Sequence, residues 1–258
     1  MKSLGELVLE SLFNRLKYSE NNAIYEYNIN AKIKKFNNLQ FVSLVVHALT
    51  LLEKSNGTIL FNGNKKIESI TLMIACLLKG KAFAPLNPNI DENKLSEIKS
   101  QVPNHTFIKV DRSLWEQNNL NITSVKQLLH DLQEYNLSER SSSHLAYIIF
   151  TSGTTGTPKG VQIKRDSLYT FICYLRDNLK IRPSNTQLSL SPSFFDNFIF
   201  DLSIFIANQS PILISNALEF IDTYETCNDS DIVKSIDFVY AAPSIIRRLV
   251  NKRFFEFS

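Results

Sequence analysis

The chain has 258 residues, of which 44% are hydrophobic and 21% are charged, and this apolar content is too high for an intrinsically disordered protein. The formal net charge of +3 is too small a bias to indicate a nucleic-acid partner. The longest apolar run, Leu72–Leu78, is far shorter than the ~20 residues of a membrane-spanning helix, so we expect no membrane span.

Cysteine usage and the N-terminal pattern indicate the compartment. Cys76, Cys173 and Cys227 lie far apart, without the short spacings of a disulfide framework or a zinc site, and the four histidines show no metal-ligand spacing. The N-terminal apolar stretch contains acidic residues, as an amphipathic helix does and a signal peptide does not. We therefore expect a cytoplasmic protein that supplies no metal ligands of its own.

The first part of the chain alternates between helical and extended patterns. Apolar spacing predicts helices over residues 4–16 and 38–54. Short apolar runs and periodic segments then follow one another: strand 58–61, helix 67–79, strand 82–86, helix 91–101 and strand 106–110. Such strand–helix–strand alternation predicts a parallel sheet with helices on its faces.

A polar stretch over residues 111–143 is the expected connection between two lobes, because a second rhythm begins after it. This rhythm predicts strands at 145–150, 161–163, 187–191, 211–214 and 238–241, and helices at 166–179, 194–207 and 244–252. The predicted fold class is α/β, with two βαβ-type lobes of parallel sheet flanked by helices. We expect the lobes to comprise residues 1–143 and 144–258.

The most distinctive segment is the Gly/Thr-rich loop that follows the strand at 145–150. Three of the seven glycines, Gly153, Gly156 and Gly160, fall within it, together with five hydroxyl side chains and Lys159. Glycines let backbone N–H groups turn toward an anion, hydroxyls donate to phosphate oxygens, and a lysine adds positive charge. The spacing is not that of a Walker A loop, because Gly153 and Gly156 are only two residues apart and Lys159 precedes a glycine. A flexible linker is the alternative interpretation.

This segment, Tyr147-x-x-x-Thr-Ser-Gly-Thr-Thr-Gly-x-Pro-Lys-Gly-Val161, resembles the phosphate-binding signature of the adenylate-forming (AMP-binding) superfamily. That superfamily includes acyl-CoA synthetases, luciferases and amino acid adenylation domains such as those of nonribosomal peptide synthetases. Segments 78–88, 195–198 and 242–244 agree in order with further family motifs, with departures at Lys81, Asn87 and Phe198. The resemblance is closest to amino acid adenylation domains and D-alanine–carrier protein ligases.

The resemblance implies ATP and Mg²⁺ as cofactors and assigns roles to individual residues. The loop residues that would hold the ATP phosphates are Thr151, Ser152, Gly153, Thr154, Thr155, Gly156 and Lys159. Asp196 stands where amino-acid-activating members hold the substrate ammonium; the alternative is that it caps an aromatic helix. We expect the phenylalanines of this segment to be core rather than pocket: Phe194, Phe195, Phe198 and Phe200.

The implied reaction is activation of a carboxylic acid, most simply an amino acid, as an acyl-adenylate with release of pyrophosphate, followed by transfer to a carrier-protein thiol. The family's catalytic lysine and C-terminal lid domain have no counterpart in this sequence. The expectation is therefore an N-terminal fragment that does not complete adenylation alone at a normal rate, with a carrier protein or a second chain that completes the enzyme as candidate partners. Two alternatives stay open: an acyl- or aryl-CoA ligase, and a non-catalytic remnant that binds a nucleotide or a partner. A basic cluster around Arg247 and Arg248 is either a solvated helix face or a contact for an acidic carrier protein.

Overall fold

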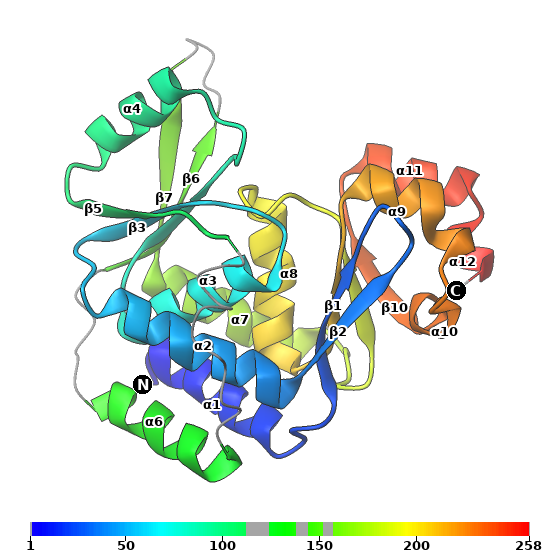
Figure 1. Cartoon of the computed structure of the whole chain (residues 1–258), viewed down its shortest axis with the longest axis horizontal. Helices are drawn as coiled ribbons and strands as arrows, with labels where there is room; N and C mark the ends of the chain where they lie inside the picture. The colour runs from blue at the N-terminus through cyan, green and yellow to red at the C-terminus, as the bar shows by residue number, and fades with distance from the viewer. Residues whose placement is uncertain (1, 112–123, 138–143, 152–156, 258) are drawn as a thin grey trace.

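The computed structural model describes residues 2–111, 124–137, 144–151 and 157–257, and its framework is two five-stranded, mostly parallel sheets (Figure 1). Sheet A has the strand order β10-β8-β9-β1-β2, with β10 at Ile236–Tyr240, β8 at Thr186–Ser189, β9 at Ile212–Ile214, β1 at Asn22–Tyr27 and β2 at Ile33–Asn37. Sheet B has the order β5-β3-β4-β6-β7, with β5 at His105–Ile108, β3 at Thr58–Asn62, β4 at Phe83–Leu86, β6 at Leu145–Thr151 and β7 at Lys159–Lys164. Only the end strands β2 and β7 run antiparallel to their neighbours.

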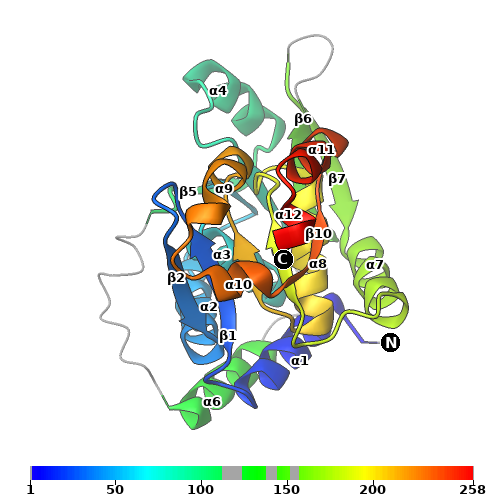
Figure 2. The same cartoon turned by 90° about the vertical axis from the view of Figure 1, so that its right-hand side faces the viewer.

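Helices fill the space between the sheets and cover their outer faces (Figures 1 and 2). The inner helices are α1 (Leu4–Leu16), α2 (Asn38–Leu52), α3 (Ile67–Lys79), α7 (Arg165–Asn178) and α8 (Asp196–Asn208), with α6 (Val125–Leu137) beside α1 and α2. The outer face of sheet B carries α4 (Glu92–Gln101). The outer face of sheet A carries α9 (Ala217–Thr223), the 3₁₀ turn η1 (Tyr224–Thr226), α10 (Ser230–Lys234), α11 (Pro243–Asn251) and α12 (Phe254–Phe257).

The alternation of side chains along the strands divides the core into three parts. Along β3, Ile59 and Phe61 face the inner helices, whereas Leu60 faces α4. In sheet A, Ile212 and Ile214 face the inner helices, whereas Leu213 faces the outer ones. The inner cluster therefore joins both sheets through one continuous apolar layer, to which α3 contributes along most of its length.

The predicted α/β rhythm is confirmed, and the differences have physical reasons. The hairpin of β1 and β2 was not predicted. Strand β1 joins sheet A by pairing with β9, which lies far away in the sequence, so no local pattern indicates this pairing. The stretch 111–143 is not purely a connection, because it contains α6. Over residues 125–133, where burial is described, Leu128 and Leu132 are the buried residues of this helix, so its sequence looks polar. The division into lobes 1–143 and 144–258 stays a prediction, and the sheets do not follow it: β1 and β2 belong to sheet A, and β6 and β7 to sheet B.

Searching the described residues reveals no helix that is long and apolar enough to cross a membrane. The three cysteines are free thiols.

Arg15 fastens three inner helices to one another. Its side chain is only 2% exposed and donates from Nη2 to the carbonyl oxygens of Phe205 (2.7 Å) and Ser210 (3.3 Å), at the end of α8. Nη1 donates to Oδ1 of Asn38 (3.1 Å), at the start of α2. The guanidinium lies 3.7 Å from the ring centroid of Phe205. Burial lowers the pKa of Arg15 to about 9, so the protein holds this charge with neutral acceptors at an electrostatic cost.

We expect Arg15→Ala to lower the free energy of unfolding by about 3 kcal/mol or more, because three buried acceptors lose their donor and a cavity forms. Urea denaturation followed by circular dichroism measures the change. Lys17→Ala, at an exposed position on the same stretch of chain, is the control and should stay within about 0.5 kcal/mol of the wild type. A loss for Arg15→Ala no larger than that of the control would contradict this role.

Candidate functional site

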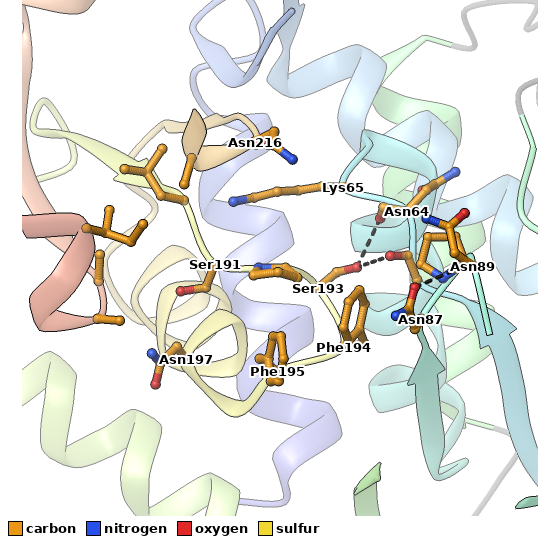
Figure 3. A pocket seen from close by; sticks show the side chains of 18 residues that line it. Asn64, Lys65, Asn87, Asn89, Ser191, Ser193, Phe194, Phe195, Asn197 and Asn216 are labelled. Carbon is orange, nitrogen blue, oxygen red and sulfur yellow. Dashed lines mark hydrogen bonds between the residues drawn. The ribbon is translucent and has the colours of Figure 1, made fainter. Parts of the chain in front are cut away.

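A cavity of about 800 Å³ lies where the carboxyl ends of strands from both sheets meet (Figure 3). Its lining comes from the segments that directly follow β3, β4, β8, β9 and β10, namely residues 63–65, 87–89, 190–195, 197, 216–217, 241–242 and 245. In open parallel sheets, ligands bind at this end of the strands, because the connecting loops there diverge and leave a crevice. The position therefore makes this cavity the candidate site.

The β3–α3 connection, residues 63–66, holds the two sheets together at the cavity. Ser193 Oγ, after β8, donates to the carbonyl oxygens of Gly63 (2.6 Å) and Asn64 (3.1 Å). Lys65 Nζ donates to the carbonyl oxygen of Ser189 (2.7 Å), the last residue of β8. The spacing of the two sheets at the cavity is thus fixed by hydrogen bonds from one loop of sheet B to sheet A.

Gly63 permits this close approach. A Cβ at this position would stand 2.9 Å from Ser193 Oγ and 3.1 Å from the carbonyl oxygen of Leu86. A side chain would therefore push the connection away from sheet A, so a glycine is required here for steric reasons.

The cavity wall combines aromatic rings with side-chain amides. Phe194 and Phe195 line it, and Phe195 is 52% exposed, so the expectation that these two rings belong to the core is wrong. Phe198, in contrast, is 1% exposed and packs in the inner core as predicted. Five asparagines supply donors and acceptors at the wall: Asn64, Asn87, Asn89, Asn197 and Asn216.

A buried carboxyl lies close to the cavity lysine. Asp201 on α8 is 1% exposed, and burial raises its pKa above the ordinary value. Burial also lowers the pKa of Lys65, while each group's charge partly offsets the effect on the other. Within the described residues, no direct ion pair joins them. Asp201 does not line the cavity, whereas Lys65 does.

The predicted phosphate loop begins at the end of β6 and reaches the start of β7, and these two strands pair antiparallel. Thr151 and Lys159 pair across the two strands, and Thr151 Oγ1 donates to the carbonyl oxygen of Lys159 at 3.4 Å. Both residues are exposed. The other predicted loop residues, Ser152, Gly153, Thr154, Thr155 and Gly156, lie outside the described residues. Because β6 runs parallel to β4, and β4 to β3, the loop leaves sheet B at the same edge as the cavity segments 63–65 and 87–89.

Two contacts shape the second half of this hairpin. Gly160 lies opposite Phe150, and a Cβ there would stand 3.0 Å from the Phe150 ring and from Ile148. Gln101 Nε2, at the end of α4, donates to the carbonyl oxygen of Pro158 (2.8 Å). The segment that carries Lys159 is therefore anchored to sheet B on one side and to α4 on the other.

Asp196 is the first residue of α8, and its side chain is bound by Tyr147. Phe195 holds the N-cap position without a side-chain cap bond, so the interpretation of Asp196 as the helix cap is wrong. Tyr147, on β6, donates from its hydroxyl to Asp196 Oδ1 at 2.9 Å and stacks on Phe83. Burial, followed by the charge of Asp196, raises the pKa of Tyr147, which keeps it a proton donor. Asp196 is exposed and does not line the cavity, although its neighbours Phe195 and Asn197 do.

Comparison with known proteins identifies the family. The sequence model of the family described as AMP-binding enzyme matches residues 47–258, which is more than half of the chain. The chain belongs to this family. It is 31% identical to the D-alanine--D-alanyl carrier protein ligase of Streptococcus agalactiae over 169 residues, which cover 63% of this chain and 32% of that ligase. It is 28% identical to nonribosomal peptide synthetase GRA1 of Gibberella zeae over 192 residues, or 72% of this chain and 2% of the synthetase.

Solved structures of adenylate-forming enzymes share the fold. The Vibrio cholerae adenylation domain AlmE, in complex with glycyl-adenosine-5'-phosphate, superposes with a TM-score of 0.73 at 13% identity and covers 95% of this chain. ATP-bound MatB from Rhodopseudomonas palustris gives a TM-score of 0.68 at 14% identity and covers 96% of this chain. In both cases the AMP-binding chain described here spans 51% of the solved chain.

Sequence reasoning missed several cavity residues of this AMP-binding chain, among them Asn64, Lys65, Ser191 and Asn216. They form no motif, and they come together only because strands distant in the sequence end at one place. The available signal was their position at or directly after a predicted strand end.

We expect Tyr147 and Asp196 to be energetically coupled. In a double-mutant cycle of Tyr147→Phe and Asp196→Ala, the interaction energy should be about 1 kcal/mol, because a hydroxyl donates to a carboxylate that is open to solvent. Tyr147→Phe keeps the ring on Phe83, so the cycle isolates the hydrogen bond. Urea denaturation of the four proteins measures it, and additive effects would show that the bond contributes nothing in solution.

Proposed function

We propose that this adenylate-forming chain binds ATP and takes part in activating an amino acid as its acyl-adenylate, which is then transferred to a carrier-protein thiol in the cytoplasm. The observation that carries the proposal is the family match, which includes the complete Thr-Ser-Gly loop between Thr151 and Lys159. The similarity to a D-alanine carrier ligase and to a peptide synthetase supports an amino acid as substrate and a carrier protein as partner.

In this proposal the hairpin loop binds the triphosphate. Thr151, Ser152, Thr154 and Thr155 donate hydroxyl hydrogen bonds, and Lys159 contributes positive charge. The two glycines of the loop, Gly153 and Gly156, offer backbone N–H groups to the phosphates. The described residues contain no group of three His, Cys, Asp or Glu side chains arranged to hold a metal ion. A Mg²⁺ bound together with ATP would neutralise part of the phosphate charge.

The cavity holds the acid in this proposal, and Asp196 receives the ammonium of an amino acid. Tyr147 already presents a hydrogen bond to the Asp196 carboxylate, so it positions that group beside the strand leading into the loop. The substrate carboxylate attacks the α-phosphorus, a new P–O bond forms and pyrophosphate leaves. Positioning and charge stabilisation supply most of the rate in such a transfer, and the apolar wall of the cavity excludes water from the mixed anhydride.

One observation favours a second candidate, an acyl- or aryl-CoA ligase. Asp196 does not line the cavity, and the wall near it is formed by Phe194 and Phe195. A substrate without an ammonium group would have no need of Asp196.

Lys159→Ala should weaken Mg·ATP binding about tenfold, because a charge-assisted contact to phosphate is lost. Isothermal titration of the purified chain with Mg·ATP measures the affinity. Lys164→Ala, at the other end of the same strand and also exposed, is the matched control and should leave the affinity within twofold of the wild type. An unchanged affinity for Lys159→Ala, or an equal loss in both variants, would count against the phosphate-binding role.

Asp196→Ala should reduce amino acid binding about tenfold and leave Mg·ATP affinity unchanged, because only the ammonium partner is removed. ATP–pyrophosphate exchange and NMR titration with a panel of amino acids, D-alanine included, and with simple acids as controls, provide the readouts. Asp166→Ala removes an exposed acid from the first turn of a different helix, α7, and should change neither affinity. A response to simple acids alone, unaffected by Asp196→Ala, would favour the CoA ligase.

A further inference from the structure

The described side chains that line the cavity at the strand ends carry charge of one sign only, which is positive. Among the described residues that line it, Lys65 is the only one with an ionisable side chain, and all others are apolar, amide, hydroxyl or glycine residues. The side chain of Lys65 runs across the cavity from the loop beside Asn64 toward β8, below Asn216 (Figure 3). A ligand in the cavity therefore meets a cation and no lining carboxylate.

The ammonium of Lys65 has bonding capacity left for a ligand. An ammonium carries three N–H donors, and one of them is used by the carbonyl oxygen of Ser189. In the described part of the chain, Lys65 has no other hydrogen-bond acceptor. Two donors are thus available, and a carboxylate placed beside them would accept charge-assisted hydrogen bonds.

The surroundings of Lys65 make an anionic partner favourable. Burial lowers the pKa of Lys65, which reflects the cost of holding its charge with little solvent. Asp201 offsets this cost only in part, because it makes no direct ion pair with Lys65 and burial raises its own pKa. A ligand carboxylate would supply the missing counter-charge, and the amides of Asn64 and Asn216 lie at the same wall to donate further hydrogen bonds.

We propose that the acid bound in this cavity is a dicarboxylic acid, whose second carboxylate is held by Lys65. The inference rests on the proposed function in one respect, since it takes the cavity as the site of the acid. Lys65 becomes a specificity-determining residue, because the apolar neighbours of the cavity strengthen its attraction for an anion.

A purely structural role for Lys65 makes a different prediction. The bond to Ser189 links the β3–α3 connection to sheet A, so a residue that serves only this link would affect stability and not the choice of acid. The discriminating quantity is therefore the ratio of affinities for two ligands that differ in one charge.

The test is NMR titration of the 258-residue chain with succinate and with succinamate, which has the same shape but one amide in place of a carboxylate. Neither ligand carries an ammonium, so the result does not depend on Asp196. The wild type should bind succinate about tenfold more tightly than succinamate. In Lys65→Gln, which can still donate to Ser189, the ratio should fall to about one. Lys66→Gln, at the exposed neighbouring position, should keep the wild-type ratio.

Equal or weaker binding of succinate by the wild type, or an unchanged ratio in Lys65→Gln, overturns the inference. If Lys65→Gln does not fold, as judged by circular dichroism, Lys65→Met serves as the second variant, and the wild-type ratio alone can still refute the idea. Titration with Mg·ATP separates this inference from the proposed function. ATP binding without a preference for succinate refutes only the dicarboxylate, whereas the absence of both refutes both.

Discussion

The fold depends on one constraint, which is that helix α3 has no solvent-facing side. Every residue from Ile67 to Leu77 is buried, and a helix that is buried on every side must be covered on every side by other elements. Helices α1, α2 and α6 contact α3, and its side chains belong to the apolar cluster that joins the inner faces of sheets A and B. Because α3 follows β3 directly, the loop between them reaches sheet A at the end of β8, and the cavity forms at that place.

The charged side chains buried in this interior form their hydrogen bonds mainly with backbone groups at helix ends, and less with side chains of opposite charge. Glu26 on β1 accepts from the backbone N–H of Ile67 at 2.8 Å, at the start of α3, and Arg165 Nη2 donates to the carbonyl oxygen of Leu77 at 2.7 Å, near its end. Arg15 does the same at the end of α8. The signs agree with the helix dipole, which favours an acid at the N-terminus and a base at the C-terminus. These bonds orient the helices whose ends surround the cavity.

Sequence reasoning succeeded where the signal was local and failed where the contact was distant. The helix at 67–79 and the strands around it were predicted because each is a short apolar run between polar residues. The phosphate-binding role of Thr151 and Lys159 stays a prediction, made because both belong to one contiguous loop. The pairing of β1 with β9, the bond from Tyr147 to Asp196 and the reach of Lys65 to Ser189 join residues far apart in the chain. No periodicity records such pairs, because they depend on how the sheets pack and not on local propensity.

The order of strands in sheet A has a consequence for synthesis of the chain. Strand β1 is made early, yet Ile24 pairs with Ile212, so its parallel neighbour leaves the ribosome much later. Until then, the hairpin of β1 and β2 has an open edge, and the residues Ala23–Tyr27, all buried in the final fold, lack their cover. Such long-range pairing slows folding and exposes apolar strands to wrong partners. The nascent chain therefore exposes this apolar hairpin until β9 has been synthesised and can pair with β1.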